Sequence, residues 1–565
     1  MGRRVLRGEP GTLAWIALAL LLIGAGVFLY AETRAATFWF DEWGWVLHRR
    51  GSDLDTFLEP HNGHLSLVPV VAYKVLLAIF GLDVFGPYRL MAIAGHVTVV
   101  ALVFAYARPR VGGFMALLAA ALLLFLGPAW NNILWPFQIG WLISLGAALG
   151  AFLMLDRGDR LGDTCAAVLL ALSLASSGLG LPVALGMAVD VLWGKRRWRD
   201  AWIVAAPLAL YGVWWLAYQD SPLEGRLVDV PGEIADSAAA AVGALLGFGA
   251  EAVPGHSGSL LEWGRPLAVL ALVLFVWRVV RLGRIPPRVL AFLAILVSFW
   301  AATELSRGWL SNPDESRYLY VGGLFVVLIA VELARGVSVS WRAAAVVTAV
   351  ALAAMVSNIA ILRDAGAFVR QQGEVTRAVL GAVELSRPSV RPGYVIAGIP
   401  GYPLVTVDAR SYFDVAAEDG TPASNLSELA TGPAYARGAA DRELIRIRGT
   451  DLQRTRAEAS PGGAGPAVDA ASGGTVARRD GCVGLRATGA RPAVLQATVP
   501  ADGVRLTAQG GPARVGVRRF GDSFEPIGRV APSAPVVLRL PGDRAPQPWH
   551  VQVEAAERAS VCGLG

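Results

Sequence analysis

The sequence predicts a mostly α-helical membrane protein, with a bundle of about eleven transmembrane helices followed by a C-terminal β-sandwich outside the cytoplasm. Three observations support this prediction. Hydrophobic residues make up 55% of the 565 residues and charged residues only 17%, which is too apolar for an ordinary soluble enzyme. Long apolar segments recur through residues 1–362. Short alternating segments, separated by Gly and Pro, fill residues 481–565.

The apolar segments are candidate membrane spans, since a helix needs about 20 apolar residues to cross a bilayer. They lie near 12–31, 88–106, 112–128, 139–155, 164–177, 180–194, 201–218, 266–282, 287–304, 318–334 and 343–362. The first resembles a signal peptide, but no clean small-residue cleavage site follows it, so we expect a retained helix. The short pair 164–177 and 180–194 is either two spans or one broken hairpin, and both alternatives give the same topology.

Positive charges decide the topology, because short loops rich in Arg and Lys stay in the cytoplasm. With eleven spans and a cytoplasmic start, one side receives most of them: Arg3, Arg4, Arg7, Arg108, Arg110, Arg157, Arg160, the KRRWR run at 195–199, Arg278, Arg281, Arg284, Arg288, Arg335 and Arg342. Counting the apolar segment 65–82 as a twelfth span would reverse this pattern. We therefore predict an in-plane or re-entrant helix there, with Lys74 reaching water. The loop 32–87 and everything after 363 then lie outside the cytoplasm.

The overall charge and composition add two expectations. The formal net charge of +6 does not indicate a nucleic-acid-binding protein, because the placement of the arginines follows the expected membrane topology. Abundant Ala, Gly and Arg with very few Lys is typical of a GC-rich bacterial genome, for example an actinobacterial one.

The stretch FWFDEW at 38–43 places Asp41 and Glu42 at the outer end of the first apolar segment. A carboxylate so close to the hydrocarbon boundary is costly unless it faces water or a partner, so the pair is a functional candidate. The alternative is that the pair only solvates a helix end. Further polar residues of the same loop favour a functional role: Asp53, Asp55, Glu59, His61 and His64.

The order of these parts resembles the GT-C superfamily of polytopic membrane glycosyltransferases, especially protein O-mannosyltransferases and aminoarabinose transferases. The matching features are the acidic pair after the first span, HNGHLSLVPVVAYKVLLAIFG at 61–81, and Tyr88-Arg89 at the start of the next span. ESRYLYVGGLFVVLIA at 315–330 is similar to a late span of that family. The resemblance covers about residues 10–362. The chain departs from the family pattern where PHNGH replaces a pair of prolines.

The resemblance implies a GT-C-type glycosyltransferase that moves a sugar from a polyprenyl-phosphate donor to an acceptor hydroxyl on the extracytoplasmic side. Because a lipid phosphate leaves readily, such an enzyme chiefly needs a base for the acceptor hydroxyl, and one carboxylate suffices. We expect an inverting displacement with Asp41 as the base and Glu42 as the second choice. The partners would be the membrane, a lipid-linked sugar donor, and a cell-envelope glycan, lipid or protein acceptor.

Five residues are candidates for substrate binding. Arg89 or Arg317 would hold the donor phosphate through charge-assisted hydrogen bonds. Each has a structural alternative, since Arg89 could be a snorkelling residue at a span end and Arg317 could pair with Glu315 or Asp314. Tyr318 belongs to the same RYL motif as Arg317. The other candidates are the two histidines of the first loop.

His61 and His64, three residues apart and close to acids, are compatible with a divalent cation, but the sequence does not give a complete ligand set. Hydrogen bonding to the sugar or phosphate is the favoured alternative. We therefore assign no metal ligands and expect no required cofactor, with a divalent cation left as an alternative.

The C-terminal third is expected to be a separate extracytoplasmic region. We predict a mixed connecting segment at 363–456, a flexible linker at 457–480 and a β-sandwich at 481–565. Cys482 and Cys562 flank the predicted strands, and in an oxidising compartment they would form a disulfide, the alternative being two free thiols. The domain could bind glycan or serve as a packing or assembly module.

Two other classes of function stay open at this point. A transporter or flippase of lipid-linked saccharides would favour internal repeats and charged or broken helices at mid-membrane, whereas the acids here cluster at one surface. A non-catalytic scaffold would bind cell-wall glycan through its C-terminal domain. The sequence does not identify the sugar, the acceptor or the oligomeric state.

Overall fold

The computed structural model describes residues 11–194, 198–218, 225–307, 312–396, 407–448, 452–454, 465–532, 534–540 and 545–564. Residues 195–197 of the basic run and 457–464 of the predicted linker lie outside this range. The chain divides into two units, which are described separately. Unit 1 comprises Met1–Arg34, His48–Phe80 and Val84–Arg370. Unit 2 comprises Ala35–Leu47, Gly81–Asp83 and Gln371–Gly565, so two short pieces of the first loop belong to it.

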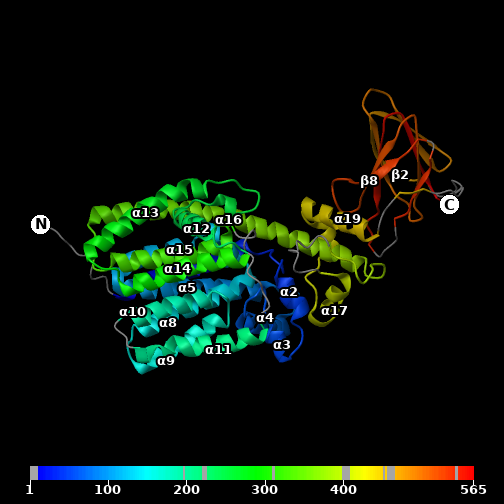
Figure 1. The fold of residues 1–565 in the computed structure, drawn as a ribbon. Coiled ribbons are helices and arrows are strands. Elements are labelled where there is room, and N and C mark those ends of the chain that lie inside the picture. Colours follow the sequence, from blue (N-terminus) through cyan, green and yellow to red (C-terminus); the bar gives the residue numbers. More distant parts are fainter. Residues whose placement is uncertain are drawn as a thin grey trace. The chain divides into compact units, whose positions relative to one another are not determined.

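Unit 1 is a bundle of α-helices with short 3-10 helices between them (Figure 1). Its elements are α1 (Gly11–Glu32), α3 (Leu54–Leu58), α4 (Leu67–Phe80), α5 (Gly86–Val111), α6 (Gly113–Leu124), η1 (Gly127–Ala129), α7 (Trp130–Leu134), η2 (Pro136–Gln138), α8 (Ile139–Leu155), α9 (Arg160–Leu174), α10 (Gly180–Trp193), η3 (Trp198–Asp200), α11 (Trp202–Tyr218), α12 (Val230–Leu245), η4 (Ala250–Ala252), α13 (Leu260–Leu282), α14 (Pro287–Arg307), α15 (Ser316–Ala334) and the first part of α16 (Trp341–Leu385). All eleven predicted segments are largely helical.

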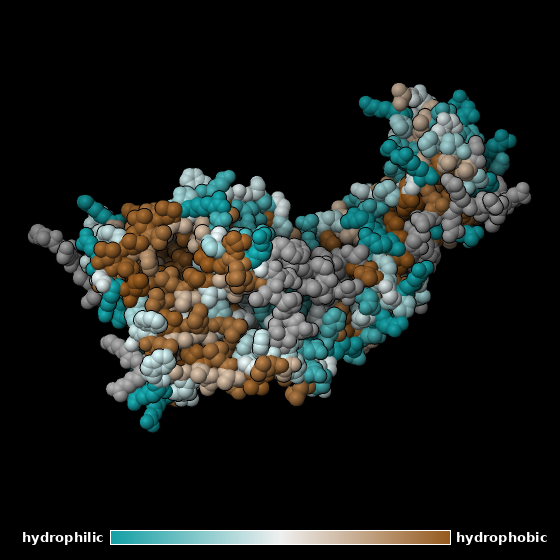
Figure 2. All heavy atoms as spheres, viewed as in Figure 1, coloured by the Kyte–Doolittle hydropathy of each residue, from teal (hydrophilic) through white to brown (hydrophobic). Residues whose placement is uncertain are grey.

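Among the residues that the structure describes, seven helices are long and apolar enough to cross a membrane, and the bent pair α6–α7 would make eight. The other three predicted spans are α9, α10 and α13. Helices α9 and α10 have 15 and 14 residues. At about 1.5 Å per residue they are shorter than the ~30 Å hydrocarbon core. Apolar side chains cover much of the visible face of unit 1 (Figure 2). These features support a multi-pass membrane protein.

The apolar segment 65–82 forms α4, whose 14 residues are too few to cross the hydrocarbon core. Its lysine does not simply extend toward water. Lys74 Nζ donates hydrogen bonds to the carbonyl oxygens of Arg49 and Gly51, both at 2.7 Å. The side chain therefore connects α4 to the loop that precedes α3.

Unit 2 combines helices with a β-sandwich. The helices are α2 (Glu42–His48), which begins in this unit, the last part of α16, α17 (Ala409–Asp419), α18 (Leu426–Thr431) and α19 (Ala434–Arg448). The strands are β1 (Gln453–Arg454), β2 (Ala467–Ser472), β3 (Gly474–Arg479), β4 (Cys482–Ala487), β5 (Ala493–Thr498), β6 (Val504–Gln509), β7 (Ala513–Arg518), β8 (Glu525–Val530), β9 (Val536–Leu538), β10 (His550–Ala555) and β11 (Arg558–Gly563).

The strands form two antiparallel sheets, with orders β1-β9-β6-β11-β4-β3 and β2-β5-β10-β7-β8. Alternate residues of β5, β6 and β10 are buried, which is the pattern of sheets with one face in a core. Cys482 and Cys562 lie opposite each other on β4 and β11 and are joined by the predicted disulfide. The predicted fold class, helices followed by a β domain, is confirmed. Strands β2 and β3 fall inside the range predicted as linker, so the β domain begins earlier than expected.

The hydrophobic core of unit 2 is shared between the sandwich and the helices before it. Buried side chains from both sheets pack in one cluster with Ala378 and Ala382 of α16, Leu429 of α18, and Ala440 and Leu444 of α19. The range 363–456, predicted as a connecting segment, therefore supplies helices to the core of the β domain.

Candidate functional site

Asp41 and Glu42 lie in unit 2, where a tight turn leads into α2. The backbone N–H groups of Glu42 and Trp43 donate to the carbonyl oxygens of Trp39 and Phe40. Phe40 has a φ of 56°, in the left-handed region that a residue with a side chain rarely adopts. Such a conformation costs about 1–3 kcal/mol and is typical of functional sites. The strained residue immediately precedes Asp41.

Both carboxylates are buried. Glu42 is fully buried, and its Oε2 accepts a hydrogen bond from the N–H of Trp39 at 2.8 Å. This contact closes the turn from the inside, in the manner of the acidic residue of a helix capping box. Asp41 is 5% exposed. The geometry therefore gives Glu42 a role in holding the turn.

Aromatic side chains pack around this turn within unit 2. The indole of Trp43 is fully buried and lies 6.1 Å from the ring of Phe38 and 6.3 Å from that of Tyr412 on α17. The Tyr412 hydroxyl contacts the hydroxyl of Thr421, and burial raises its pKa. These contacts connect the first-loop piece 35–47 to α17.

Arg89 lies at the start of α5 in unit 1, and its side chain donates hydrogen bonds to residues at the end of α1. Its Nε donates to the hydroxyl of Thr33 at 3.0 Å, and Nη2 donates to the carbonyl oxygen of Tyr30. The guanidinium also lies 3.9 Å from the centre of the Tyr30 ring. Since these contacts satisfy carbonyl groups at a helix C-terminus, they support the structural alternative for Arg89.

Arg317 and Tyr318 lie in the first turn of α15. Arg317 Nη2 pairs with Glu315 Oε1 at 2.9 Å, and its guanidinium lies 5.1 Å from the centre of the Tyr318 ring. The ring of Tyr318 packs against Trp141 at 6.0 Å and Phe299 at 6.1 Å. The pairing expected as one alternative for Arg317 is therefore present.

His61 and His64 flank a two-residue turn. Asn62 and Gly63 have φ values of 51° and 77°, as in a type I′ turn, and the two histidines exchange backbone hydrogen bonds at 2.9 and 3.0 Å. The His61 ring lies 5.4 Å from the ring of Phe137. A Cβ added to Gly178 would lie 2.5 Å from His64 Nδ1, so this ring packs directly on the turn between α9 and α10.

The described residues contain no group of three or more His, Cys, Asp or Glu side chains arranged to hold a metal ion. Asp41 and Glu42 belong to unit 2, whereas the histidine pair, Arg89, Arg317 and Tyr318 belong to unit 1. Within unit 1, Arg89 contacts the end of α1, the histidine pair contacts η2 and the α9–α10 turn, and the Arg317–Tyr318 pair contacts Glu315, Trp141 and Phe299.

Arg49, which the sequence analysis did not single out, organises the loop before the histidines. Its Nη2 donates to the carbonyl oxygens of Glu59 at 2.9 Å and Pro60 at 3.1 Å, and its Nη1 donates to that of Thr56 at 3.2 Å. Burial lowers the pKa of this guanidinium, partly offset by Glu59. In the sequence, the only indication of this role is that Arg49 directly precedes a loop rich in acidic residues.

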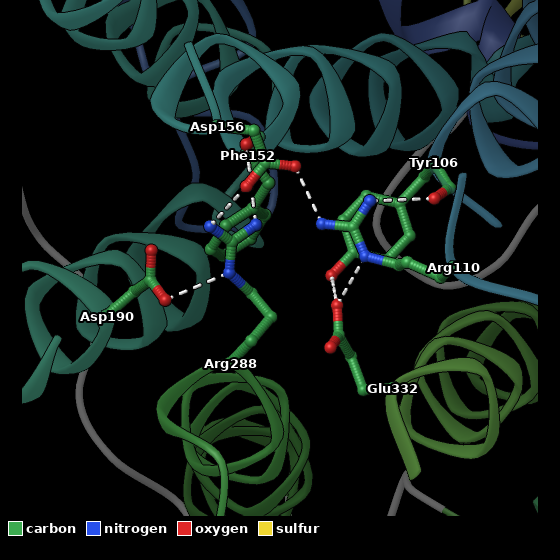
Figure 3. Close-up of polar contacts among 7 residues, drawn as sticks. All are labelled: Tyr106, Arg110, Phe152, Asp156, Asp190, Arg288 and Glu332. Carbon is green, nitrogen blue, oxygen red and sulfur yellow. Dashed lines mark hydrogen bonds and ion pairs between the residues drawn. The ribbon is translucent and has the colours of Figure 1, made fainter. Parts of the chain in front are cut away.

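A network of charged side chains, also missed, joins five helices of unit 1 (Figure 3). Arg110 of α5 pairs with Glu332 of α15 and with Asp156, at the end of α8, both at 2.6 Å. Arg288 of α14 pairs with Asp190 of α10 at 2.9 Å and with Asp156 at 3.0 Å. The Tyr106 hydroxyl donates to Glu332. In the sequence, the only indication of this network is that the three acids lie close to arginine-rich loops.

Comparison with models of protein families found no match, and comparison with curated proteins also found none. Among solved structures, the chain is similar to ArnT from Cupriavidus metallidurans bound to undecaprenyl phosphate. The TM-score is 0.43 and the sequence identity 14%, over 75% of this chain and 87% of that chain. The similarity to this protein is one of fold, at low sequence identity.

Proposed function

We propose that this chain is a GT-C-type membrane glycosyltransferase that moves a sugar from a polyprenyl-phosphate donor to an acceptor hydroxyl on the extracytoplasmic side. The observation that carries the proposal is the turn after α1, where the strained Phe40 precedes the buried carboxylates of Asp41 and Glu42. A catalytic base must be held in one orientation relative to its substrate, and a buried turn closed by the hydrogen bond from Trp39 to Glu42 is suited to that.

In the proposed reaction, Asp41 accepts the proton of the acceptor hydroxyl while the hydroxyl oxygen attacks the anomeric carbon of the sugar. The bond between that carbon and the phosphate oxygen breaks, and the polyprenyl phosphate leaves with the electron pair. The displacement inverts the anomeric centre. Glu42 acts as a positioning residue through the N–H of Trp39. A base of this kind contributes about 10²–10⁴ to the rate.

For the donor phosphate we favour Arg317. The guanidinium of Arg89 already donates to Thr33 and Tyr30, whereas Arg317 pairs with the partly exposed carboxylate of Glu315, which a phosphate could replace. Tyr318, His61 and His64 stay proposed substrate contacts, and a divalent cation is not required by this mechanism.

An extracytoplasmic location of the C-terminal domain is part of the proposal. The disulfide between Cys482 and Cys562 supports it, because disulfides persist in oxidising compartments. Since α16, α18 and α19 share the core of the sandwich, we favour a packing or assembly role for this domain over a free glycan-binding module.

A deletion strain tests the proposal. Lipid-linked sugars and cell-envelope glycans would be compared between the deletion strain, its parent, and strains that carry the wild-type chain, Asp41→Asn or Asp502→Asn at equal membrane levels. Asp502→Asn is the control, because this exposed carboxylate lies in a turn of the β domain and has no proposed role. We expect the deletion to lose a glycan and accumulate its donor, and only Asp41→Asn to fail in restoring it.

Two results would contradict parts of the proposal. Restoration by Asp41→Asn would show that this residue is not the base. Unchanged glycans and lipid-linked sugars in the deletion strain would argue against glycosyl transfer itself, and movement of labelled lipid without a glycosidic product would favour a flippase.

A further inference from the structure

The segment 127–138 of unit 1 lies between α6 and α8 and consists of short, bent helical pieces. The axes on either side of the break, Gly113–Leu124 and Gly127–Leu134, are bent by 51°. The chain then continues as the short pieces η1, α7 and η2 before α8 begins. Irregular backbone at membrane depth occurs where it is buried in protein or lines a polar cavity, and broken helices often carry binding sites.

This segment holds buried amide atoms that have no hydrogen-bond partner among the described residues. Asn132 is fully buried, and neither its Oδ1 nor its Nδ2 is paired. Gln138 is 2% exposed with an unpaired Oε1, and the Oδ1 of Asn131 is unpaired too. Each such group costs about 1–3 kcal/mol. A stretch of twelve residues that retains several of them indicates a use for these groups other than stability.

Asn358 of α16 provides an internal comparison. It is as fully buried as Asn132, and it packs against the same segment. Its Oδ1 accepts the N–H of Gly127 at 3.2 Å, and its Nδ2 donates to the carbonyl oxygen of Ala244 at 3.3 Å. Where an asparagine has a structural role in this part of the bundle, both of its amide atoms are thus paired.

The neighbouring side chains suggest the chemistry of the ligand. Trp135 and Phe137 stack with ring centres 5.0 Å apart, and the ring of His61 lies edge-on to Phe137. An amide offers both N–H donors and a carbonyl acceptor without charge, which matches a hydroxyl group. Apolar and aromatic surfaces with a few polar groups are typical of small-molecule sites.

We propose that Asn132 and Gln138 form a binding subsite for an uncharged, hydroxyl-rich group, the sugar ring of a substrate. This inference rests on the proposed function, since the sugar belongs either to the lipid-linked donor or to the acceptor glycan. In this subsite the amides hydrogen-bond the sugar hydroxyls, and the aromatic pair lies beside them in the chain.

Binding to the full-length protein in nanodiscs tests the proposal without requiring catalysis. The probes are undecaprenyl-phosphate mannose and glucose, sugar-free undecaprenyl phosphate as the matched lipid, and the free methyl glycosides of both sugars. We expect Asn132→Leu and Gln138→Met to weaken binding of a sugar-bearing probe at least about tenfold, the loss of 1.4 kcal/mol or more. Binding of the sugar-free lipid should be unchanged.

A structural measurement accompanies the binding experiment. Replacing an unpaired buried amide by an apolar side chain removes a desolvation cost, so Asn132→Leu should keep or raise the thermal midpoint. The matched variant Asn358→Leu should lower the midpoint, because it removes two hydrogen bonds. Loss of binding to the sugar-bearing lipids would assign the subsite to the donor, and loss confined to the methyl glycosides would assign it to the acceptor.

The proposal is overturned if wild type binds the sugar-bearing and sugar-free lipids equally and does not bind the glycosides. It is also overturned if Asn132→Leu lowers the midpoint as Asn358→Leu does, since that would indicate a structural water only. A failure of the proposed function alone would give another result. Wild type would bind the sugar-bearing probes more tightly than the sugar-free lipid, Asn132→Leu would lose this preference, and no glycosidic product would form.

Discussion

The two ends of the helical unit bury polar groups in opposite ways. Near the end of α5 at Val111, two guanidinium groups and three carboxylates are paired with one another across five helices (Figure 3). In the segment 127–138, by contrast, both amide atoms of Asn132 and the amide oxygen of Gln138 are buried without a partner in the described part of the chain. His96 contacts the carbonyl oxygen of Leu124. His96 therefore lies close to the start of the segment 127–138, and it precedes Arg110 by 14 residues on α5. At about 1.5 Å per residue, the two regions are about 20 Å apart along this helix.

The difference distinguishes polar groups that stabilise the fold from polar groups that are available to bind a ligand. A buried charge is costly unless it is paired, and every charged group of the Figure 3 network has a partner of opposite sign. Such a network fixes helix positions and leaves little capacity for a ligand. The unpaired amide atoms of Asn132 and Gln138, by contrast, could each form a hydrogen bond with a ligand. The comparison supports a structural role for the paired end and is consistent with the substrate contact that we propose for the other.

The largest expected effect comes from breaking the paired end. Arg288→Gln would leave Asp190 buried without its cation, while Asp156 keeps Arg110, and breaking a buried pair in this way typically costs about 3–5 kcal/mol. Thermal and denaturant unfolding of the purified protein would measure it. The double variant Arg288→Met with Asp190→Leu should recover most of the loss, because both partners of one pair are removed. A single variant as stable as wild type would contradict the structural role of this network.

A smaller effect is expected where the histidine hairpin meets the bundle. In Gly178→Ala the new Cβ would lie 2.5 Å from His64 Nδ1, so the ring must move. Overpacking of this kind costs about 1–3 kcal/mol. Transfer should fall as well if His64 contacts substrate. The control is Gly212→Ala in α11, where nothing lies within 4 Å of the added Cβ and stability should stay level or rise slightly. Equal behaviour of the two variants would show that His64 tolerates displacement.

The smallest expected effect concerns a third way of burying a carboxylate, in unit 2. Asp441 of α19 accepts hydrogen bonds from the backbone N–H groups of Arg519 and Gly521 at 2.8 Å and of Phe520 at 3.0 Å. Burial raises the pKa of Asp441 above the ordinary value of 3.8, and these N–H groups oppose the shift. The positive charge of Arg519 also opposes the shift.

Because the folded state of Asp441 binds its proton more tightly than the unfolded state, its contribution to stability falls as pH rises from 3.8 through the raised pKa, and then levels off. The measurement is the free energy of unfolding against pH for wild type and Asp441→Asn. The free energy of unfolding of wild type, relative to that of Asp441→Asn, should fall as pH rises through this range. A constant difference would contradict the raised pKa.

The sequence predicted features that depend on local composition. Apolar length located the helices at all eleven predicted segments of unit 1 but not α12 (Val230–Leu245), and the cysteine positions predicted the disulfide that joins Cys482 to Cys562. The acidic pair was found because two carboxylates beside an apolar run are unusual. The range that contains strands β2 and β3 was predicted as linker because Ala, Gly and Ser dominate its first part, including β2. Pairing of β2 with β5 and of β3 with β4 places both strands in the sheets.

Features that depend on distant contacts could not be predicted in this way. The partners of Arg288 are 98 and 132 positions away in the chain, so spacing gives no sign of them. The role of Arg89 at the end of α1 and the packing of His64 on Gly178 are likewise tertiary contacts. The positive φ of Phe40 carries no sequence signal, because left-handed residues are usually Gly or Asn.

The most direct test of the account measures the rate of sugar transfer from a lipid-linked donor by the purified wild-type protein and by Asp41→Asn. Asp41 as the base predicts a fall of about 10²–10⁴ in the rate, with the thermal midpoint and donor binding close to those of wild type. Transfer by Asp41→Asn at the wild-type rate would contradict the central claim.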